Sequence, residues 1–597
     1  MSLDKRARAY GIQPTYSVVD GPDRIAPSDT LEALLKALGA ERQEPLAQEP
    51  VLEAPEGAQC FLTQDGRYWG IALQLYQLRT SRNWGIGDFA DLEHLARTVA
   101  PAGADFLGLN PLHAMFLAAP AQRSPFSPSN RRFLNPLYLA VDRVPGFLPD
   151  MVDDTELEHL RASELVDYVG VATTKLRVLR AIWEAGAALP DSFVREGGAL
   201  LHRHALFEAL SAEMVAQGHG AGWIGWPEEW RDVTGAAVQD FAQKHKDDIR
   251  FFQWLQYLCS QQLHALRALC EQVGMRIGLY LDFAVGEAAD GSGSWGSADV
   301  LADVRIGAPP DSYNEQGQDW GLAPLSPLVM ARESAAPFRS LIEAATRQAG
   351  ALRIDHAMGL WQLYLIPEDA SAADGTYARY PVGDMLRALS DASLENRTVI
   401  IGEDLGNVPP GFQEVMTDCN ILSYRIFFFE RTAEGFVPPA DYPREALACL
   451  STHDLPTFRG WWRGDDIALR KRFGFIAEKG ARKQNKERKA ERADLLADLQ
   501  KAGMLTKAEA QTINANEAPP ALITAVHGHL ATAPSRLFAV RLEDLAAELN
   551  PVNIPATVDE YPNWRSKLGL QLDQLTQTEL FNDIIAAIAA ARPRTAG

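Results

Sequence analysis

The sequence has 597 residues, of which 47% are hydrophobic and 23% are charged, and its formal net charge is −21 at pH 7. This length exceeds what one simple core absorbs, so it predicts a large domain with insertions or several domains. The negative charge argues against nucleic acid and anionic membranes as partners, because both would repel the chain. The net charge does not exclude a neutral polymer as a ligand.

The cysteines and the apolar segments indicate a cellular compartment. The five cysteines include no CxxC pair, and Cys259, Cys270 and Cys449 lie inside apolar segments, as reduced core thiols do. The N-terminal MSLDKRARAYG is basic but no apolar region follows it, so no signal peptide is expected. No window reaches the ~18 consecutive apolar residues of a membrane-spanning helix. We therefore expect a soluble, cytoplasmic protein.

Residues 1–66 are expected to form a small helical N-terminal segment followed by a linker. Ser28, Asp29 and Thr30 precede LEALLKALG, which predicts an N-cap, an amphipathic helix and a closing glycine. Residues 41–56 are rich in Glu, Gln and Pro and indicate a linker. This part of the chain shows no candidate catalytic group.

From residue 67 onward, short β-branched or aromatic runs alternate with helical stretches, a pattern typical of βαβ units. The candidate strands are residues 70–78, 105–110, 275–283, 351–355, 398–403, 421–429, 446–452 and 535–542. Eight such runs fit the α/β fold called a (β/α)8 or TIM-type barrel. We expect this catalytic barrel to span residues 67–597.

The uneven spacing of these strands predicts helical insertions at about residues 113–270 and 461–533. The second insertion includes the charge-rich residues 479–503, whose mixed signs and scattered leucines predict a solvated helical hairpin. The late FNDIIAAIAAA predicts a closing helix that packs on the barrel.

Three of the apolar runs lead into a carboxylate, namely Asp355, Glu403 and Asp454, spaced by about fifty residues. Parallel-barrel enzymes carry their chemistry at the C-terminal ends of their strands. A single acid there is more often a helix cap. Three acids in register, two of them beside His356 and His453, favour a catalytic site. Two carboxylates with a third acid are what glycosidic-bond chemistry requires.

The neighbours of two acids predict different protonation states. In an alternating strand, Arg353 and Asp355 share one face, so the guanidinium keeps this carboxylate ionised, as a nucleophile requires. Glu403 ends an apolar strand, and burial raises the pKa of a carboxyl, which suits a proton donor. The adjacent Asp404 is acidic too, which leaves open whether it or Glu403 faces the site.

Asp454 has two interpretations. A third carboxylate can bind the hydroxyls of a sugar ring, but Thr452, His453 and Asp454 could equally form a buried polar turn. A metal site is a competing function for these acids and histidines. Because the sequence has no HExxH or paired-histidine spacing, we expect no metal site.

Three further segments are candidates for a binding surface. Residues 308–324 read APPDSYNEQGQDWGLAP, a long loop that presents Tyr313 and Trp320 for stacking on sugar faces. The alternative is a loop pinned to the barrel by its tryptophan. NWGIGD at residues 83–88 and SPFSP at 124–128 follow the first two strands and are expected on the same face.

Together these segments resemble the 4-α-glucanotransferases (amylomaltases, disproportionating enzymes) of glycoside hydrolase family 77, of the longer bacterial maltodextrin-utilisation type. The resemblance covers about residues 70–570. It rests on QLYQLRTSRNWGIGDFADL, GLNPLHAMF, SPSNRRFLNP, GQDWGLAP, ALRIDHAMGL, IIGEDLG, ILSYRIFFFE, LSTHDLPT and EYPNW. Each motif alone is weak, but so many in order are specific.

The resemblance implies a role for each catalytic acid. Asp355 matches the family nucleophile, Glu403 the general acid/base and Asp454 the stabiliser of the transition state. The same matching implies that the sugar in subsite −1, whose bond is cleaved, is held by Arg353, His453, Asp282 and Asn553.

Other matched positions are expected to contact the glucan further along its chain. Gln318 and Trp320 match a glucan-contacting loop, and Tyr313 lies in the same loop. In SPFSP, Ser124 and Phe126 are candidates for the donor side. Phe126 stands where the family commonly has tyrosine, so a hydroxyl contact would be lost.

The implied activity is that of a retaining transglycosylase. It would move α-1,4-glucan segments from maltodextrins, starch or glycogen-derived glucans to the 4-hydroxyl of an acceptor, through a glycosyl ester on Asp355. Carboxylates supply all the proton and nucleophile chemistry, so no cofactor is implied. The alternatives are an α-1,4-glucan hydrolase of the same superfamily and a non-catalytic glucan-binding protein.

Overall fold

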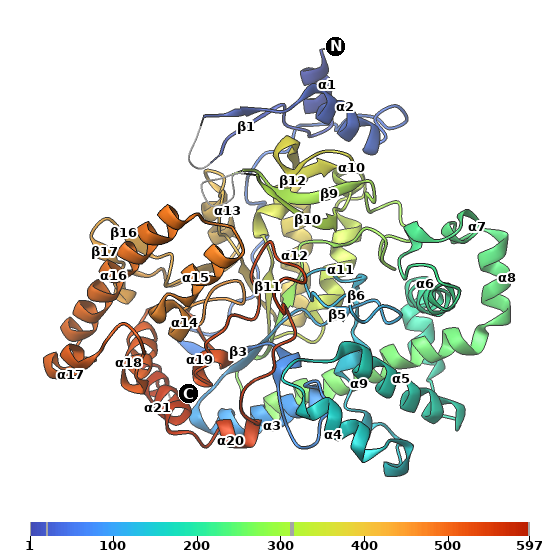
Figure 1. Ribbon diagram of the computed structural model, residues 1–597. Helices are drawn as coiled ribbons and strands as arrows, with labels where there is room; N and C mark the ends of the chain where they lie inside the picture. Colours follow the sequence, from blue (N-terminus) through green and yellow to red (C-terminus); the bar gives the residue numbers. More distant parts are fainter. Residues whose placement is uncertain (1, 19–21, 311–315, 595–597) are drawn as a thin grey trace.

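The computed structural model describes residues 2–18, 22–310 and 316–594. At its centre lies a barrel of parallel strands (Figure 1), formed by β3 Tyr68–Leu73, β4 Phe106–Leu109, β7 Gly278–Phe283, β11 Ala351–Ile354, β14 Val399–Gly402, β15 Ser423–Ile426, β18 Ala446–Cys449 and β19 Leu537–Arg541. The strand order is β14-β11-β7-β4-β3-β19-β18-β15. A parallel bridge from Ile401 to Leu422 links β14 to β15 and closes the ring. The expected (β/α)8 barrel is confirmed, and each candidate strand overlaps one of these eight.

The strands are buried on both faces, which explains their continuous apolar runs. Side chains that fill the interior come from most of the strands and include Phe106, Tyr280, Ile401, Tyr424 and Leu447. The rings of Phe106 and Tyr280 meet edge to face, with centroids 5.8 Å apart. Close packing also fixes Gly70, because a Cβ there would lie 2.3 Å from the carbonyl oxygen of Phe106.

A second, antiparallel sheet lies between the barrel and the N-terminal segment (Figure 1), and the sequence did not predict it. Its strand order is β13-β12-β9-β10-β8. The strands are β8 Glu287–Ala288, β9 Val304–Ala308, β10 Gln318–Ala323, β12 Gln362–Pro367 and β13 Thr376–Arg379. The expectation of one long loop over residues 308–324 is therefore wrong at its C-terminal end, where β10 pairs with β9.

The N-terminal segment docks on this second sheet. It contains α1 Leu3–Ala9, β1 Thr15–Tyr16, β2 Arg24–Ile25 and α2 Ser28–Ala37, and residues 41–56 contain no helix or strand. The N–H of Gln13 donates to the carbonyl of Tyr377 at 2.8 Å. The predicted cap is wrong: α2 begins at Ser28 without a side-chain cap. Thr30 instead donates its hydroxyl to the carbonyl of Asp374 at 2.6 Å.

A helical region separates β4 from β7 and lies on one side of the barrel (Figure 1). After the short strands β5 His113–Ala114 and β6 Asn130–Leu134 come α4 Asp154–Ala162, α5 Tyr168–Glu184, α6 Asp191–Ala216, α7 Glu228–Arg231, α8 Ala236–Lys244 and α9 Lys246–Gln272. Its long helices carry one apolar face each. For example, Phe251, Trp254, Leu255 and Leu258 of α9 are buried.

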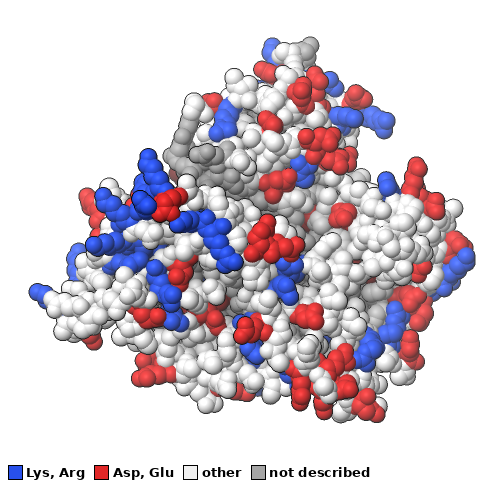
Figure 2. Space-filling model, viewed as in Figure 1, with Lys and Arg blue, Asp and Glu red and all other residues white. Residues whose placement is uncertain are grey.

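A second helical region follows β18, with α14 Phe458–Arg463, α15 Asp465–Arg472, α16 Glu478–Lys501, α17 Lys507–Thr512 and α18 Pro520–Leu530. The charge-rich residues form the single helix α16, so the expected hairpin within them is wrong. Arg488 holds this helix in place with bonds of 2.8 Å to both carboxylate oxygens of Asp466. The outer face stays charged, and Figure 2 shows lysine and arginine side chains gathered in this region.

The remaining helices cover the barrel: α3 Phe89–Val99, α10 Pro327–Arg332, α11 Ala336–Thr346, α12 Val382–Asn396, α13 Phe412–Asp418, α19 Leu542–Leu545, α20 Leu572–Leu575 and α21 Glu579–Ala591. A small hairpin, β16 Arg431–Thr432 with β17 Gly435–Phe436, follows β15. The expected closing helix is confirmed as α21. Just after it, buried Arg592 donates to the carbonyls of Tyr68 and Ala531 at 3.0 and 2.9 Å.

Two further properties bear on the expected compartment. All five cysteines are buried and free, as the apolar context of Cys259, Cys270 and Cys449 predicted. Across the described ranges, no helix combines the length and apolar character needed to cross a bilayer.

Candidate active site

The first two acids follow paired residues on neighbouring strands. Asp355 comes directly after β11 and Glu403 directly after β14, and Ile354 pairs with Gly402 at the ends of these strands. Asp454 follows β18 by five residues. All three therefore lie at the C-terminal end of the barrel, as expected from the sequence.

Arg353 forms ion pairs with two acids at the C-terminal end of the barrel, Asp282 and Asp355. Its Nη1 lies 2.7 Å from Oδ1 of Asp282, and its Nη2 lies 2.8 Å from Oδ1 of Asp355. Arg353 and Asp282 pair across β11 and β7, so strand register brings them together. Burial raises the pKa of Asp282 to about 6 even though Arg353 opposes this shift. The predicted contact between Arg353 and Asp355 is confirmed.

Glu403 is held by the main chain on both of its oxygens. Oε2 accepts the N–H of His356 at 2.8 Å, and Oε1 accepts the N–H of Leu405 at 3.0 Å. Burial raises the pKa of Glu403 to about 7; Arg353 and the two N–H donors act against this rise, while the charge of Asp355 adds to it. The predicted upward shift of this pKa is confirmed.

The adjacent Asp404 turns the other way. Its Oδ1 accepts the N–H of Tyr424 on β15 at 2.9 Å, and its Oδ2 accepts Nε2 of Gln413 on α13 at 2.7 Å. Asp404 thus stabilises the packing of α13 and β15, the next helix and strand of the barrel. Glu403, bonded to the residue after Asp355, is the member of the pair beside the other acids.

Asp454 belongs to a separate polar group at the rim. His453 Nε2 lies 3.2 Å from its Oδ2, and Nδ2 of Asn553 donates to its Oδ1 at 2.6 Å. Although partial burial would raise the pKa of Asp454, the contacts with His453 and Asn553 outweigh it and lower the pKa to about 2. In turn, Asp454 raises the pKa of His453 despite the burial of that ring. The side chain of Asp454 is 45% exposed and open to a ligand.

Phe126 forms one wall of this rim. Its ring stacks on His453, with centroids 4.5 Å apart and an interplanar angle of 26°. It also lies 5.5 Å from the ring of Trp564. Ser124 begins the turn that carries Phe126, since its carbonyl accepts the N–H of Ser127 at 3.0 Å. The structure thus brings Phe126 to the acids, while Ser124 sits at the base of the turn.

The second sheet supplies another wall. Trp320 on β10 meets the ring of His356 edge to face, with centroids 5.1 Å apart. Its Nε1 donates to Oε1 of Gln318 at 3.1 Å. Trp320 and Gln318 are thus connected to the residue after Asp355. Tyr313, the third aromatic candidate, lies outside the described residues.

This arrangement can be compared with known proteins. The family model for 4-alpha-glucanotransferase, glycoside hydrolase family 77, matches residues 73–572. The chain belongs to this family. It is 33% identical over 572 residues to the 4-alpha-glucanotransferase of Haemophilus influenzae, which covers 91% of this chain and 80% of the relative. The Mycobacterium tuberculosis 4-alpha-glucanotransferase is 36% identical over 556 residues, or 89% and 75% of the two chains.

Solved structures agree with this assignment. The amylomaltase of Corynebacterium glutamicum superposes with a TM-score of 0.84 at 27% identity and covers 98% of this chain and 99% of its own. Amylomaltase from Streptococcus agalactiae, solved with acarbose, gives a TM-score of 0.72 at 17% identity over 88% and 99% of the two chains, a likeness of fold alone. The expected family and the expected class, a glucanotransferase enzyme, are confirmed.

Sequence reasoning left two residues of this candidate site without a role. His356 was noted only as a neighbour of Asp355, yet its main chain holds Glu403. Trp564 backs Phe126 and His453, and its φ of 61° places it in the left-handed region. The only signals were the motifs RIDH and EYPNW, in which each residue stands.

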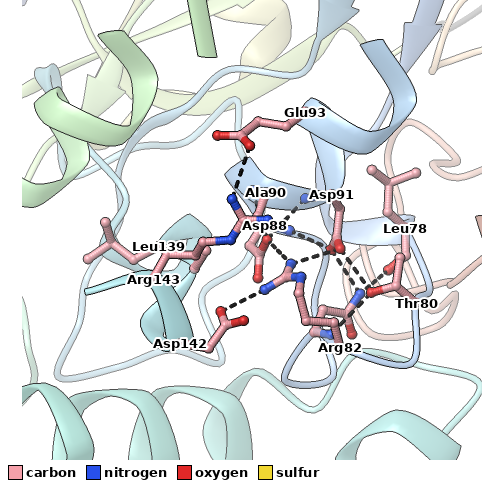
Figure 3. Close-up of polar contacts among 12 residues, drawn as sticks. Leu78, Thr80, Arg82, Asp88, Ala90, Asp91, Glu93, Leu139, Asp142 and Arg143 are labelled. Carbon is pink, nitrogen blue, oxygen red and sulfur yellow. Dashed lines mark hydrogen bonds and ion pairs between the residues drawn. The ribbon is translucent and has the colours of Figure 1, made fainter. Parts of the chain in front are cut away.

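The segment at residues 83–88 has a structural role in this family member. Asp88 caps α3 in a capping box with Asp91. Arg82 bonds to Asp88, to Asp91 at 2.8 Å and to Asp142 at 2.7 Å (Figure 3). Asn83 donates to Asp91 at 3.0 Å. These contacts fix the turn after β3 and do not reach the three acids.

The acids and histidines of the site do not form a metal centre in the part of the chain that the structure describes. Within residues 2–18, 22–310 and 316–594, no group of three or more His, Cys, Asp or Glu residues is arranged to hold a metal ion.

Proposed function

We propose that the chain is a retaining 4-α-glucanotransferase that transfers α-1,4-glucan segments through a glycosyl ester on Asp355. The observation that carries this proposal is the contrast between two adjacent carboxyls. Asp355 is paired with Arg353 at 2.8 Å, whereas burial raises the pKa of Glu403 to about 7. An ion pair with an arginine suits Asp355 to the role of nucleophile, and a raised pKa suits Glu403 to that of proton donor.

In the first step a carboxylate oxygen of Asp355 attacks the anomeric carbon of the donor glucan. Glu403 gives its proton to the glycosidic oxygen, the bond to that oxygen breaks, and the shortened glucan leaves. In the second step Glu403, now charged, accepts the proton of the acceptor's 4-hydroxyl. That oxygen attacks the anomeric carbon, displaces Asp355 and restores an α-1,4 bond. Two inversions retain the configuration.

The neighbouring groups bind the sugar in subsite −1. Asp454 has its pKa lowered to about 2, so at neutral pH it is an acceptor for sugar hydroxyls. His453 and Asn553 orient Asp454, at 3.2 and 2.6 Å. Arg353 and Asp282 form the floor beneath Asp355. No metal or organic cofactor takes part in this scheme.

The aromatic walls suit maltodextrins and starch or glycogen-derived glucans, whose sugar faces are apolar. Phe126, which stacks on His453 next to Asp454, and Trp320, which meets His356 edge to face next to Asp355, provide such surfaces. The buried free cysteines suit a reducing cytoplasm.

The test is the product set from purified maltotriose. Glucose with a ladder of longer maltodextrins supports transfer, only shorter sugars support hydrolysis, and unchanged maltotriose supports a binding protein. Proton NMR of the first products then shows whether the new anomeric centre keeps the α configuration.

A further inference from the structure

His356 adopts a backbone conformation that histidine rarely takes. Its φ of 47° and ψ of 62° lie in the left-handed region, where the Cβ of any residue other than glycine is crowded. The residue stands between Asp355 and the short turn Ala357–Leu360. Such strain persists only where the surroundings impose it, and it clusters at functional sites.

This conformation aims two successive N–H groups at Glu403. The N–H of His356 bonds to the carboxylate Oε2 at 2.8 Å. The N–H of Ala357 bonds to the main-chain carbonyl of Glu403 at 2.9 Å. The turn therefore binds both the side chain and the backbone of Glu403. A change in the backbone angles of His356 alters the bond from its N–H to Oε2.

The side chain of His356 points to another element. Its ring lies 5.1 Å from the ring of Trp320, at 78°, and Trp320 is fastened to Gln318 within β10. Burial lowers the pKa of the imidazole to about 4, with Asp355 opposing and Arg353 reinforcing the shift. The ring is uncharged at neutral pH, so it acts on Trp320 by packing.

We propose that His356 is a positioning residue that couples the indole of Trp320 to the carboxyl of Glu403. The proposal rests on the proposed function, because it takes Glu403 as the proton donor and Trp320 as a surface for sugar. The main-chain N–H of His356 binds the carboxyl of Glu403, and its ring contacts the indole of Trp320. A change in the packing of the ring therefore changes the N–H bond to Oε2.

The direction of the coupling follows from the chemistry of that bond. An N–H donor favours the charged form of a carboxyl and lowers its pKa. The charged groups that face Glu403 are Arg353, which lowers this pKa, and Asp355, which raises it. A sugar stacked on Trp320 tightens the bond and lowers the pKa of Glu403, which keeps this carboxyl charged when the acceptor hydroxyl arrives.

The test is the pH dependence of kcat/KM for maltotriose in four proteins: wild type, Trp320→Ala, His356→Ala and the double variant. Because Glu403 must be protonated for the first step, activity falls as pH rises through its pKa. Loosening one N–H bond raises that pKa, so each single variant moves the alkaline limb upward by about 0.5–1 pH unit. The double variant moves it no further than His356→Ala does.

Asparagine tolerates the left-handed region better than alanine. His356→Asn keeps the backbone conformation but lacks the ring that meets Trp320. It therefore moves the alkaline limb less than His356→Ala does, and adding Trp320→Ala to it has no further effect. This pair carries the test if His356→Ala does not fold. The matched control is Phe429→Ala, which removes an aromatic side chain that is 53% exposed after β15 and leaves the limb unmoved.

The proposal is overturned if Trp320→Ala shifts the limb as much in the His356→Ala background as in wild type. It is also overturned if His356→Asn shifts the limb as far as His356→Ala. Failure of the underlying function shows differently: Glu403→Gln would then keep the wild-type activity and its alkaline limb.

Discussion

Replacing Arg353 by methionine tests whether this residue neutralises the acids beneath the site. The side chains of Arg353 and Asp282 are each only 8% exposed, and that of Asp355 is 18% exposed. Methionine has a similar length but no charge, so Asp282 would stay buried without a cation. Breaking a buried ion pair in this way costs about 3–5 kcal/mol of stability. Removing both partners, in Arg353→Met with Asp282→Asn, costs less because no charge is left uncompensated.

The pH dependence of this loss has a definite sign. Burial raises the pKa of folded Asp282 to about 6 against the opposition of Arg353, and its unfolded value is about 3.9. Without Arg353 the folded pKa rises further. A carboxyl with a raised folded pKa binds its proton more tightly when folded, so its contribution to stability falls as pH rises from about 4 through the folded pKa. The variant should therefore lose less stability at pH 5 than at pH 7.

Urea unfolding followed by tryptophan fluorescence measures this effect, with midpoints compared among wild type, the single variant and the double variant at both pH values. The reasoning is refuted if the single variant loses the same stability at pH 5 and pH 7 and the added Asp282→Asn restores none of it. In that case Arg353 would contribute by packing, and its charge would be incidental.

Four further substitutions test the site. Asp355→Asn should abolish turnover, while Glu403→Gln should recover the first half-reaction on a donor with a good leaving group; equal loss on activated and natural donors would contradict the acid/base role. Trp320→Ala should lower transfer roughly tenfold relative to hydrolysis, since stacking is worth ~0.5–1.5 kcal/mol; a lower melting temperature with unchanged products would indicate a packing role. Phe126→Tyr should leave stability unchanged and lower KM for maltodextrin by up to a few-fold, because a hydroxyl that finds a sugar partner is worth about 0.5–1.5 kcal/mol; early unfolding with unaltered KM would place Phe126 in the core.

The barrel could be predicted because its strands are buried on both faces. Strands such as β14, with all four residues buried, leave uninterrupted apolar runs in the sequence. Strand β10 of the second sheet leaves no such run. β10 reads QDWGLA, its first four residues are partly or fully exposed, and a register shift interrupts its pairing with β9 between Asp319 and Leu322. Polar, glycine-containing and irregular, it is indistinguishable from a loop by pattern.

The candidate site was predictable where it depends on strand register and unpredictable where distant segments meet. Arg353 and Asp355 are two residues apart on one strand, so alternation placed them on one face. No local pattern could bring Asn553 to Asp454 across 99 positions of the chain or place Phe126 over His453. Only the matched motifs connected these residues. Which of Glu403 and Asp404 faces the site likewise became clear only from the hydrogen-bond partners of each carboxyl.

The three acids show that the fold gives each carboxyl its own surroundings as well as its position. Asp355 has a guanidinium at 2.8 Å, Glu403 has burial that raises its pKa to about 7, and Asp454 has His453 and Asn553, which bring its pKa to about 2. Barrel closure alone would give three similar carboxyls at strand ends. Their differences come from neighbouring side chains, among them Arg353, His453 and Asn553, so a substitution that spares every acid can still change the surroundings on which their roles depend. Arg353 is the strongest such case, because it contacts Asp355 and also lowers the pKa of Glu403.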